Sequence, residues 1–327
     1  MKNVLFLLFA LSLSLLISCN GGKKTPGDQN ENNDTVKKLA VDTIVKENDL
    51  VKSKLKGKIK TRNENYFRVV NKSGVYTKGE LLFKLTLKYN TRGYKTEEGS
   101  YNADGSLRGK WIFKYDNKDN VTQTESYNGE GRIDRKSDYK YDDKGNMIGE
   151  TSYNSDGSLF QKVSYKYDNH GNLIQYICYN PDGGVQYKSV SIYKYDDKGN
   201  KVEENNYTSY GAKSTLTYDS KGNRTGWFTY DTDGSLVSRT VEEYDNKGYL
   251  LGYTAYNADG SMHSKAVYKN NEKGERIEES RYNSDGTLFR KYVNECEYDK
   301  TGNRIKSYTY EDGTLVSIYE FEIEYYK

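Results

Sequence analysis

Histidine, proline and cysteine are scarce in this sequence, which contains 2, 2 and 3 of them among 327 residues. With 2 histidines, the chain offers few groups for acid–base catalysis near neutral pH or for metal ligation. Hydrophobic residues make up 34% and the mean hydropathy is −0.98, which is poor material for a large three-dimensional core. Charge of one sign is not in excess, because 50 lysines and arginines face 47 acidic residues. This balance lacks the basic excess typical of nucleic-acid binding, and we expect no nucleic-acid partner.

No catalytic, phosphate-binding or metal-binding motif stands out in the sequence. His170 occupies a loop position that holds lysine, serine or threonine in sister segments, and His263 lies in "SMHSK" on the polar face of an expected strand. Neither is joined by an evident cysteine or aspartate constellation. The aspartate-rich loop "YDTDGS" at 230 lacks the ligand spacing and distal glutamate of an EF-hand, and GxxxxGK[ST], nucleophile-elbow and HExxH motifs are absent. We therefore predict a non-enzyme with no metal and no cofactor.

The N-terminus has the features of an export signal. Lys2 supplies a basic start, and residues 4–17 form an apolar stretch too short for a comfortable bilayer span. The stretch ends in Leu16-Ile17-Ser18-Cys19, which resembles the lipobox of bacterial lipoproteins. This resemblance implies cleavage before Cys19, a diacylglycerol on its sulfur and an acylated amine, which together anchor a chain stably to a membrane. An ordinary secretory peptide with a chance cysteine is the alternative.

Three segments follow from composition along the chain. Residues 1–18 are the expected signal peptide, and residues 19–50 are polar and without a sustained period, which indicates a flexible tether. About 30 flexible residues reach ~30 Å, enough to lift a folded part off a lipid surface. Residues 51–327 form the expected repeat domain.

The repeat domain consists of near copies of one sequence motif, for example "YNSDGSLFQKVSYKYDNHGN" at 153–172. Two glycine series can be aligned, with members mostly 26 residues apart and with steps that alternate between 14 and 12. The first series marks "DG" loops and the second marks "KGN" loops, with Asp119 in place of one glycine. The first comprises Gly79, Gly105, Gly131, Gly157, Gly183, Gly211, Gly234, Gly260, Gly286 and Gly313, and the second Gly93, Gly145, Gly171, Gly199, Gly222, Gly248, Gly274 and Gly302.

Loops of this chemistry, separated by 8 to 10 residues rich in tyrosine, valine, isoleucine and threonine, predict β-hairpins. Two strands per repeat give about twenty strands in an all-β antiparallel meander or solenoid, which we expect to be an open or spiralling sheet. After each "DG" loop one strand face is apolar and aromatic and the other is rich in lysine, whereas the faces after "KGN" loops are unclear. The 11-residue step from Gly211 to Gly222 would reverse the faces, so we predict an irregularity there.

Tyrosine is the one residue in large excess, with 34 copies. From Gly93 to Gly302 it stands four positions before every turn residue except one, where Asn270 replaces it. The favoured interpretation is structural, because rings at strand ends can stabilise a thin sheet while their hydroxyls stay wet. The alternative is a platform on which sugar rings or peptides stack. Cys178 and Cys296 lie too many strands apart for a disulfide in an open sheet, so we expect two free thiols.

The elements "YKYDDKGN" (193–200), "YKYDNHGN" (165–172) and "YDSKGNRTGW" (218–227) resemble the YD repeats of the Rhs family. The resemblance covers roughly residues 76–327. Members of that family build a long β-sheet that can spiral into a shell around a toxin domain. This chain ends on the strand-like "LVSIYEFEIEYYK" and has about nine repeats, so we expect neither a following effector domain nor a closed shell. The resemblance implies a lipid-anchored repeat protein of the bacterial envelope.

These observations favour a non-catalytic binding module or scaffold for a glycan or protein, anchored through Cys19 in the cell envelope, at the outer membrane and facing the periplasm or the surface. A structural spacer lipoprotein and a shell-type accessory of a toxin encoded elsewhere are the alternatives. Aromatic residues that break the repeat are the candidate ligand-binding residues. They are Trp111, Trp227, Phe228, Tyr187 and Tyr193.

Overall fold

The computed structural model describes residues 47–327. They form one short helix, α1 (Asp49–Lys52), and one sheet of twenty antiparallel strands. Within the described residues, no helix is long and apolar enough to cross a membrane. The expected signal peptide, Cys19 and nearly all of the tether lie outside the described residues.

The strands follow the chain in order. They are β1 (Ile59–Lys72), β2 (Val75–Tyr89), β3 (Lys95–Asn102), β4 (Leu107–Tyr115), β5 (Val121–Asn128), β6 (Ile133–Tyr141), β7 (Met147–Asn154), β8 (Leu159–Tyr167), β9 (Leu173–Tyr179), β10 (Val185–Tyr195), β11 (Lys201–Thr208), β12 (Lys213–Tyr218), β13 (Arg224–Tyr230), β14 (Leu236–Tyr244), β15 (Leu250–Asn257), β16 (Met262–Asn270), β17 (Arg276–Tyr282), β18 (Leu288–Tyr298), β19 (Arg304–Glu311) and β20 (Thr314–Tyr325).

The loops have the chemistry that the repeat predicts. In the β6–β7 loop, the Asp142 carboxylate accepts hydrogen bonds from the backbone N–H groups of Lys144 (3.0 Å) and Asn146 (2.8 Å), and Gly145 has φ +84°. Asp119 adopts φ +62° where sister loops have glycine, which confirms it as the stand-in. Gly79 was assigned wrongly to a turn, because it lies within β2 and the β1–β2 turn is made by Ser73 and Gly74.

A β-bulge adjoins almost every loop. Between β4 and β5, for example, Lys114 pairs with Gln123 and Tyr115 pairs with Val121, so one residue of β5 has no partner. This extra residue is the third after the turn residue and interrupts the alternation of side chains between the two faces. The interruption explains why the strand faces after the "KGN" loops were unclear from the sequence. The β11–β12 ladder runs from Glu203↔Thr217 to Tyr207↔Lys213 without a shift. The irregularity predicted between residues 211 and 222 is therefore present, because β12 lacks the bulge that adjoins other loops. Without this one extra residue, the odd 11-residue step does not reverse the faces of the strand.

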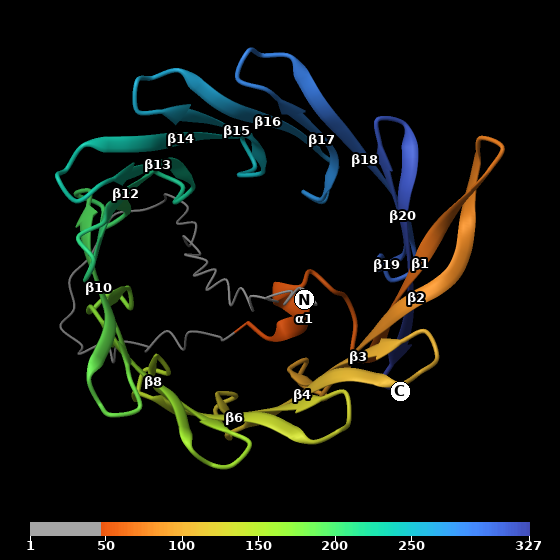
Figure 1. Cartoon of the computed structure of the whole chain (residues 1–327), viewed down its shortest axis with the longest axis horizontal. Helices are drawn as coiled ribbons and strands as arrows, with labels where there is room; N and C mark the ends of the chain where they lie inside the picture. The colour runs from red at the N-terminus through yellow and green to blue at the C-terminus, as the bar shows by residue number, and fades with distance from the viewer. Residues whose placement is uncertain (1–46) are drawn as a thin grey trace, which may run out of the picture. The chain divides into compact units, whose positions relative to one another are not determined.

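The sheet closes on itself, so the prediction of an open or spiralling sheet is wrong. β1 pairs with β2 on one side and with β20 on the other, and Asn65 is opposite Lys84 in one ladder and Glu320 in the other. The result is the twenty-stranded barrel of Figure 1. About nine repeats are thus enough for a closed wall. The step lengths do not reveal this closure, because it depends on the first and last strands meeting.

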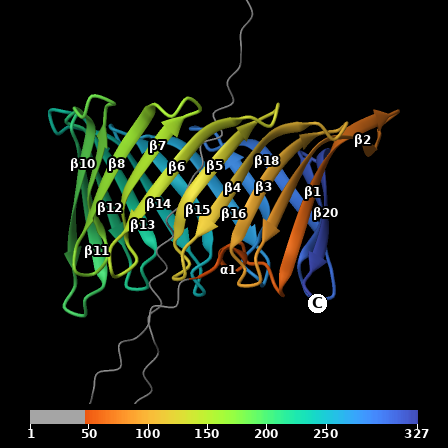
Figure 2. The same cartoon turned by 90° about the horizontal axis from the view of Figure 1, so that it is seen from below.

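Closure follows from a constant stagger between hairpins. A line of paired residues that starts at Leu87, near one end of β2, reaches Asn154 at the opposite end of β7 after five strand crossings. This drift inclines the strands to the barrel axis, as Figure 2 shows. Twenty strands about 4.8 Å apart and tilted by about 40° enclose a ring roughly 40 Å across between backbones. A barrel of this strand number is too wide to be filled by its own wall side chains.

The two faces of the wall differ sharply. We call the face that α1 packs against the inner face (Figure 1); there Leu50 forms a buried cluster with Ile59 and Tyr89, and Leu87, Ile323 and Tyr325 pack against this cluster. The inner face carries aromatic and small polar side chains, together with ion pairs such as Lys95–Glu98 and Lys201–Glu204. The outer face carries cross-strand ion pairs, many of whose lysines lie one residue from the strand end that precedes a "KGN"-type loop. They include Lys88–Glu97 (2.8 Å), Lys114–Glu125 (2.7 Å), Lys194–Glu203 (2.6 Å) and Lys269–Glu278 (2.9 Å). Charged residues such as Glu125 and Lys136 also face outward in the middle of their strands, where a lipid-facing barrel wall is apolar, so this outer face is suited to water.

The closing strand provides a direct test of the fold. Ile318 on β20 is 1% exposed and is paired with Tyr308 on one side and Phe67 on the other. We expect Ile318→Ala to lower the free energy of unfolding by about 2–5 kcal/mol, because it leaves a cavity where the wall closes. Ile192→Ala, on the outer face with 53% exposure, is the control and should change it by less than about 0.5 kcal/mol. Urea denaturation measures both, and equal effects would contradict the closed wall.

Candidate binding surface on the inner face

The tyrosines that precede the loops point in opposite directions at the two ends of the barrel. We call the end with the loops of Gly105, Gly157 and Gly260 the Asp-Gly rim, and the end with those of Gly145, Gly171 and Gly248 the Lys-Gly rim. At the Asp-Gly rim they point outward; Tyr127, for example, donates to the outer-face Glu125 (2.7 Å). At the Lys-Gly rim they point inward, where Tyr115 lies 3.4 Å from Asp49 of α1.

Several inward tyrosines donate to the backbone carbonyl that begins the strand after the preceding Lys-Gly loop, next to its bulge. Tyr141 donates to the carbonyl of Val121 (2.9 Å), and Tyr167 to that of Met147 (2.9 Å). Asn270, the exception to the tyrosine rule, makes the same bond with its amide to the carbonyl of Leu250 (2.8 Å). The structural interpretation of the tyrosine series is therefore confirmed at these positions, because the ring spans two strands and the hydroxyl satisfies a carbonyl.

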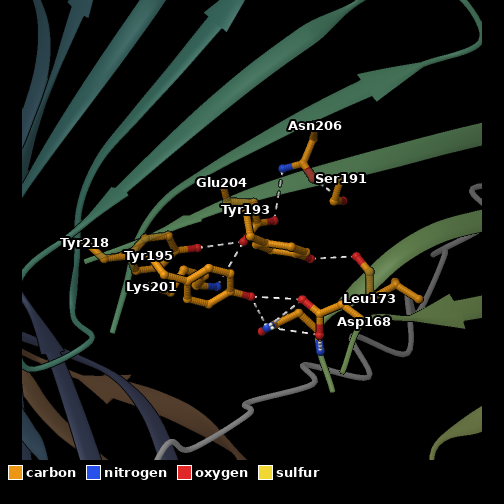
Figure 3. A network of polar contacts seen from close by, with 10 residues as sticks. Asp168, Leu173, Ser191, Tyr193, Tyr195, Lys201, Glu204, Asn206 and Tyr218 are labelled. Atoms are coloured by element: carbon orange, nitrogen blue, oxygen red, sulfur yellow. Dashed lines mark hydrogen bonds and ion pairs between the residues drawn. The ribbon is translucent and has the colours of Figure 1, made fainter. Parts of the chain in front are cut away.

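β10 and β11 carry a denser polar network, shown in Figure 3. Glu204 accepts hydrogen bonds from Lys201 (3.0 Å), Tyr218 (2.9 Å) and Asn206 (3.1 Å). Tyr193 donates to the carbonyl of Leu173 (2.6 Å), and burial raises the pKa of Tyr193 to about 12, with the negative charge of Glu204 adding to the rise. With these three hydrogen bonds the Glu204 carboxylate is fully engaged, so the network holds the wall together and Glu204 is not a free catalytic group.

Tyr195 and Asp168, at the Lys-Gly rim, form a neighbouring hydrogen-bonded pair that also holds the wall together. Tyr195 donates to Asp168 (2.9 Å) and His170 stacks on the Tyr195 ring with centroids 4.7 Å apart. Partial burial acts to raise the pKa of Asp168, but hydrogen bonds from the Asn172 backbone and from Tyr195 outweigh it, so the pKa lies below its ordinary value. His170 thus lies in a loop, as predicted, and its ring packs against a tyrosine.

A ladder of tyrosine rings crosses β8, β9 and β10 on the inner face. Tyr165, Tyr176 and Tyr187 follow one another with centroids 5.5 and 5.9 Å apart, and Tyr210 extends the series by 5.8 Å. Cys178 lies buried beside it and is a free thiol, as is Cys296, which confirms the prediction for both. The ladder presents edges and faces of aromatic rings along one stretch of the wall.

The candidate residues do not gather at one point. Trp111, Tyr187, Tyr193 and Trp227 lie on the inner face, whereas Phe228, adjacent to Trp227 on β13, lies on the outer face. Nine strand positions separate Trp111 on β4 from Trp227 on β13, which places them on opposite walls. Trp227 is 44% exposed although it faces inward. The arrangement is therefore a wide aromatic wall and not a pocket for one small molecule.

One inner-face residue, Arg281, was not among the candidates predicted from the sequence. The inner position just before each outward tyrosine holds a small or medium side chain in eight repeats and an arginine, Arg281, in one. Aligning this column across the repeats would have revealed it. The eight are Ser100, Ser126, Ser152, Cys178, Asn206, Thr229, Ala255 and Thr309. Among the described residues, no group of three or more histidine, cysteine or acidic side chains is arranged to hold a metal ion.

Comparisons with known proteins assign this chain to no family. Neither a protein-family model nor a curated protein matches the sequence. Among solved structures, the chain is similar to a porin-like protein from Bacteroides uniformis, with 13% identity and a TM-score of 0.36, over 81% of this chain and 96% of that one. A porin-like protein from Bacteroides vulgatus is 8% identical with a TM-score of 0.22, over 82% of this chain and 98% of that one. The TcdB2-TccC3-Cdc42 structure is 13% identical with a TM-score of 0.28, over 82% of this chain and 18% of that one. These values support no argument about function.

The inward tyrosines make stability sensitive to alkali. Burial is the main cause that raises the pKa values of Tyr89, Tyr141 and Tyr193 to about 12, against about 10 in an unfolded chain. Folding therefore favours the neutral phenols, and their contribution is complete below about pH 10 and is lost as pH rises from about 10 to 12. We expect the urea midpoint to fall over that interval while tyrosinate absorbance of the folded barrel lags behind that of the unfolded chain. Coincident titration of the two states would contradict this.

Proposed function

We propose that this protein is a lipid-anchored, non-catalytic binding barrel of the cell envelope, whose inner aromatic wall binds an extended polar polymer, with a glycan favoured. The observation that carries the proposal is the contrast between the two faces. Lysine–glutamate pairs lie on the outer face, while the tyrosine ladder of β8, β9 and β10 and the exposed ring of Trp227 face inward.

The inner wall has the chemistry that suits a saccharide. Sugar rings combine an apolar face, which packs against aromatic rings, with hydroxyls that need hydrogen-bond partners. The wall offers both within one stretch, because the ladder of Tyr165, Tyr176 and Tyr187 adjoins the hydroxyls of Ser189 and Ser191 on β10. Spreading aromatic groups over several strands favours a chain of several sugar units over a monosaccharide.

The closed wall also favours a second candidate function, the enclosure of a polypeptide. A barrel closed by β1 and β20 can also enclose a polypeptide, in the manner of a shell around a toxin encoded elsewhere. A spacer would need only the charged outer face. The three functions differ in what the inner wall binds: a saccharide, a polypeptide or neither.

Trp227 and Phe228 provide a matched pair for the first test. They are neighbours on β13, and Trp227 faces inward whereas Phe228 faces outward. We expect the full-length protein to bind linear neutral oligosaccharides on an array, and Trp227→Ala to weaken this binding about tenfold because it removes a stacking surface. Phe228→Ala should leave it unchanged. Binding of unfolded polypeptides alone, lost in Trp227→Ala, would favour the shell, and silence across both probe sets would favour the spacer.

Cys19 provides the test of anchoring. In a bacterium that matures lipoproteins, we expect Cys19→Ser to abolish incorporation of radiolabelled palmitate and to release the protein from the membrane fraction, because the charged outer face gives the wall no affinity for hydrocarbon. Cys178→Ser, at a buried free thiol, is the control and should keep the label. Retention of Cys19→Ser in the membrane fraction would show that something other than a lipid holds the barrel there.

A further inference from the structure

A cavity of about 410 Å³ opens at the Asp-Gly rim, between β16 and the β17–β18 hairpin. It exists because the ladder between β16 and β17 ends at Lys265↔Tyr282, while β16 continues to Met262. The backbone of β16 beyond this pair and the loop at Asn283 form its sides. The hairpin stagger that tilts the barrel thus leaves a notch in its rim.

The lining of this cavity holds more cationic than anionic groups. Arg281 and Lys265 line it as cations beside the His263 side chain, against one acidic residue, Asp285. The Asp285 carboxylate is already committed to the backbone N–H (2.9 Å) and hydroxyl (2.5 Å) of Thr287 in its own loop. The cavity therefore presents positive charge with little free negative charge to oppose an anion.

Arg281 is the residue that distinguishes this notch from its sisters. Half of its side-chain surface is exposed, and one Nε–H bond to Glu279 (2.6 Å) fixes its direction while other guanidinium donors remain for a ligand. Arg290 lies directly opposite Arg281 on β18. Like charges at directly opposed positions destabilise a sheet, and here Glu279 pairs with Arg281 and Glu311 with Arg290.

The same cavity holds aromatic surface beside the cations. Phe289 is 55% exposed and lines it together with Tyr253 and Tyr282. The Arg290 guanidinium lies over the Phe289 ring, 5.0 Å from its centroid. The Arg281 guanidinium and the exposed Phe289 ring line the same cavity, which matches a ligand with a carboxylate and an apolar face on one small unit. Inorganic phosphate offers the charge but no face for the ring.

We propose that this notch binds the carboxylate of an acidic saccharide, such as a uronic acid unit, with Arg281 pairing with the carboxylate and Phe289 packing against the sugar ring. This deepens the proposed function, since it gives the binding barrel a preference for acidic glycans. The site holds a glycan chain at one defined end of the barrel, the Asp-Gly rim.

The test compares an oligosaccharide containing glucuronic acid with the same oligosaccharide reduced at its carboxyl groups. We expect the full-length protein to bind the acidic form about tenfold more tightly in calorimetry, because a carboxylate–guanidinium pair is lost in the reduced form. Arg281→Ser, which introduces a residue that sister repeats carry here, should abolish this preference without changing the urea midpoint by much. Arg135→Ser is the control, because Arg135 is an inner-face arginine near the same rim whose guanidinium lies over Phe160 (3.5 Å), away from the cavity.

Three outcomes overturn the proposal. Equal affinity for the two saccharides removes the acidic preference, and a preference that survives in Arg281→Ser removes the site. Inorganic phosphate that binds as tightly as the acidic saccharide, and is lost in Arg281→Ser, makes this a plain anion site. In each case neutral saccharide binding that depends on Trp227 would leave the proposed function standing, whereas failure of all saccharides to bind would remove both.

Discussion

The stagger between successive hairpins is the constraint on which this structure depends. The step from a "DG" loop to the next "KGN" loop is mostly two residues longer than the step from a "KGN" loop to the next "DG" loop, and this difference moves the pairing line from Leu87 at one rim to Asn154 at the other within five crossings. The drift tilts the strands, and the tilt lets a single meander curve until β20 reaches β1. The notch between β16 and the β17–β18 hairpin is a local consequence of the same offset.

Tyrosine replaces the thick core that this composition cannot build. A wall one strand thick has little apolar volume to bury, so stability has to come from rings that cover two strands and hydroxyls that satisfy backbone carbonyls, as Tyr141 and Tyr167 do. The outer face is supported by cross-strand ion pairs such as Lys114–Glu125, each modest by itself and repeated around the ring. The inner face is left free to carry residues that break the pattern, and Trp227 and Arg281 do so.

Much of the wall could be predicted from the sequence, because hairpins are local. Strand number, loop chemistry and the role of Asp119 as a glycine substitute follow from spacing within one or two repeats, and the free state of Cys178 follows from the number of strands between it and Cys296. Closure could not be predicted, since the pairing of Asn65 with Glu320 joins the two ends of the domain and leaves no mark in any single repeat. The candidate residues were found by aromatic character alone, which placed Phe228 beside Trp227 although strand parity puts them on opposite faces. Arg281 was missed because its oddity is visible only when one column is compared across all repeats.

The pairing of β1 with β20 is the one ladder in the barrel that joins residues far apart in the chain. Every other ladder connects neighbours, so the wall can be assembled hairpin by hairpin, and loop-closure entropy is paid in full only at this last seam. A duplication or deletion of one 26-residue unit would then change the circumference by two strands and leave the seam and all other hairpins as they were. Bore width in such a protein is set by a count of copies, which gives evolution a way to resize the ring in discrete steps without redesigning any contact.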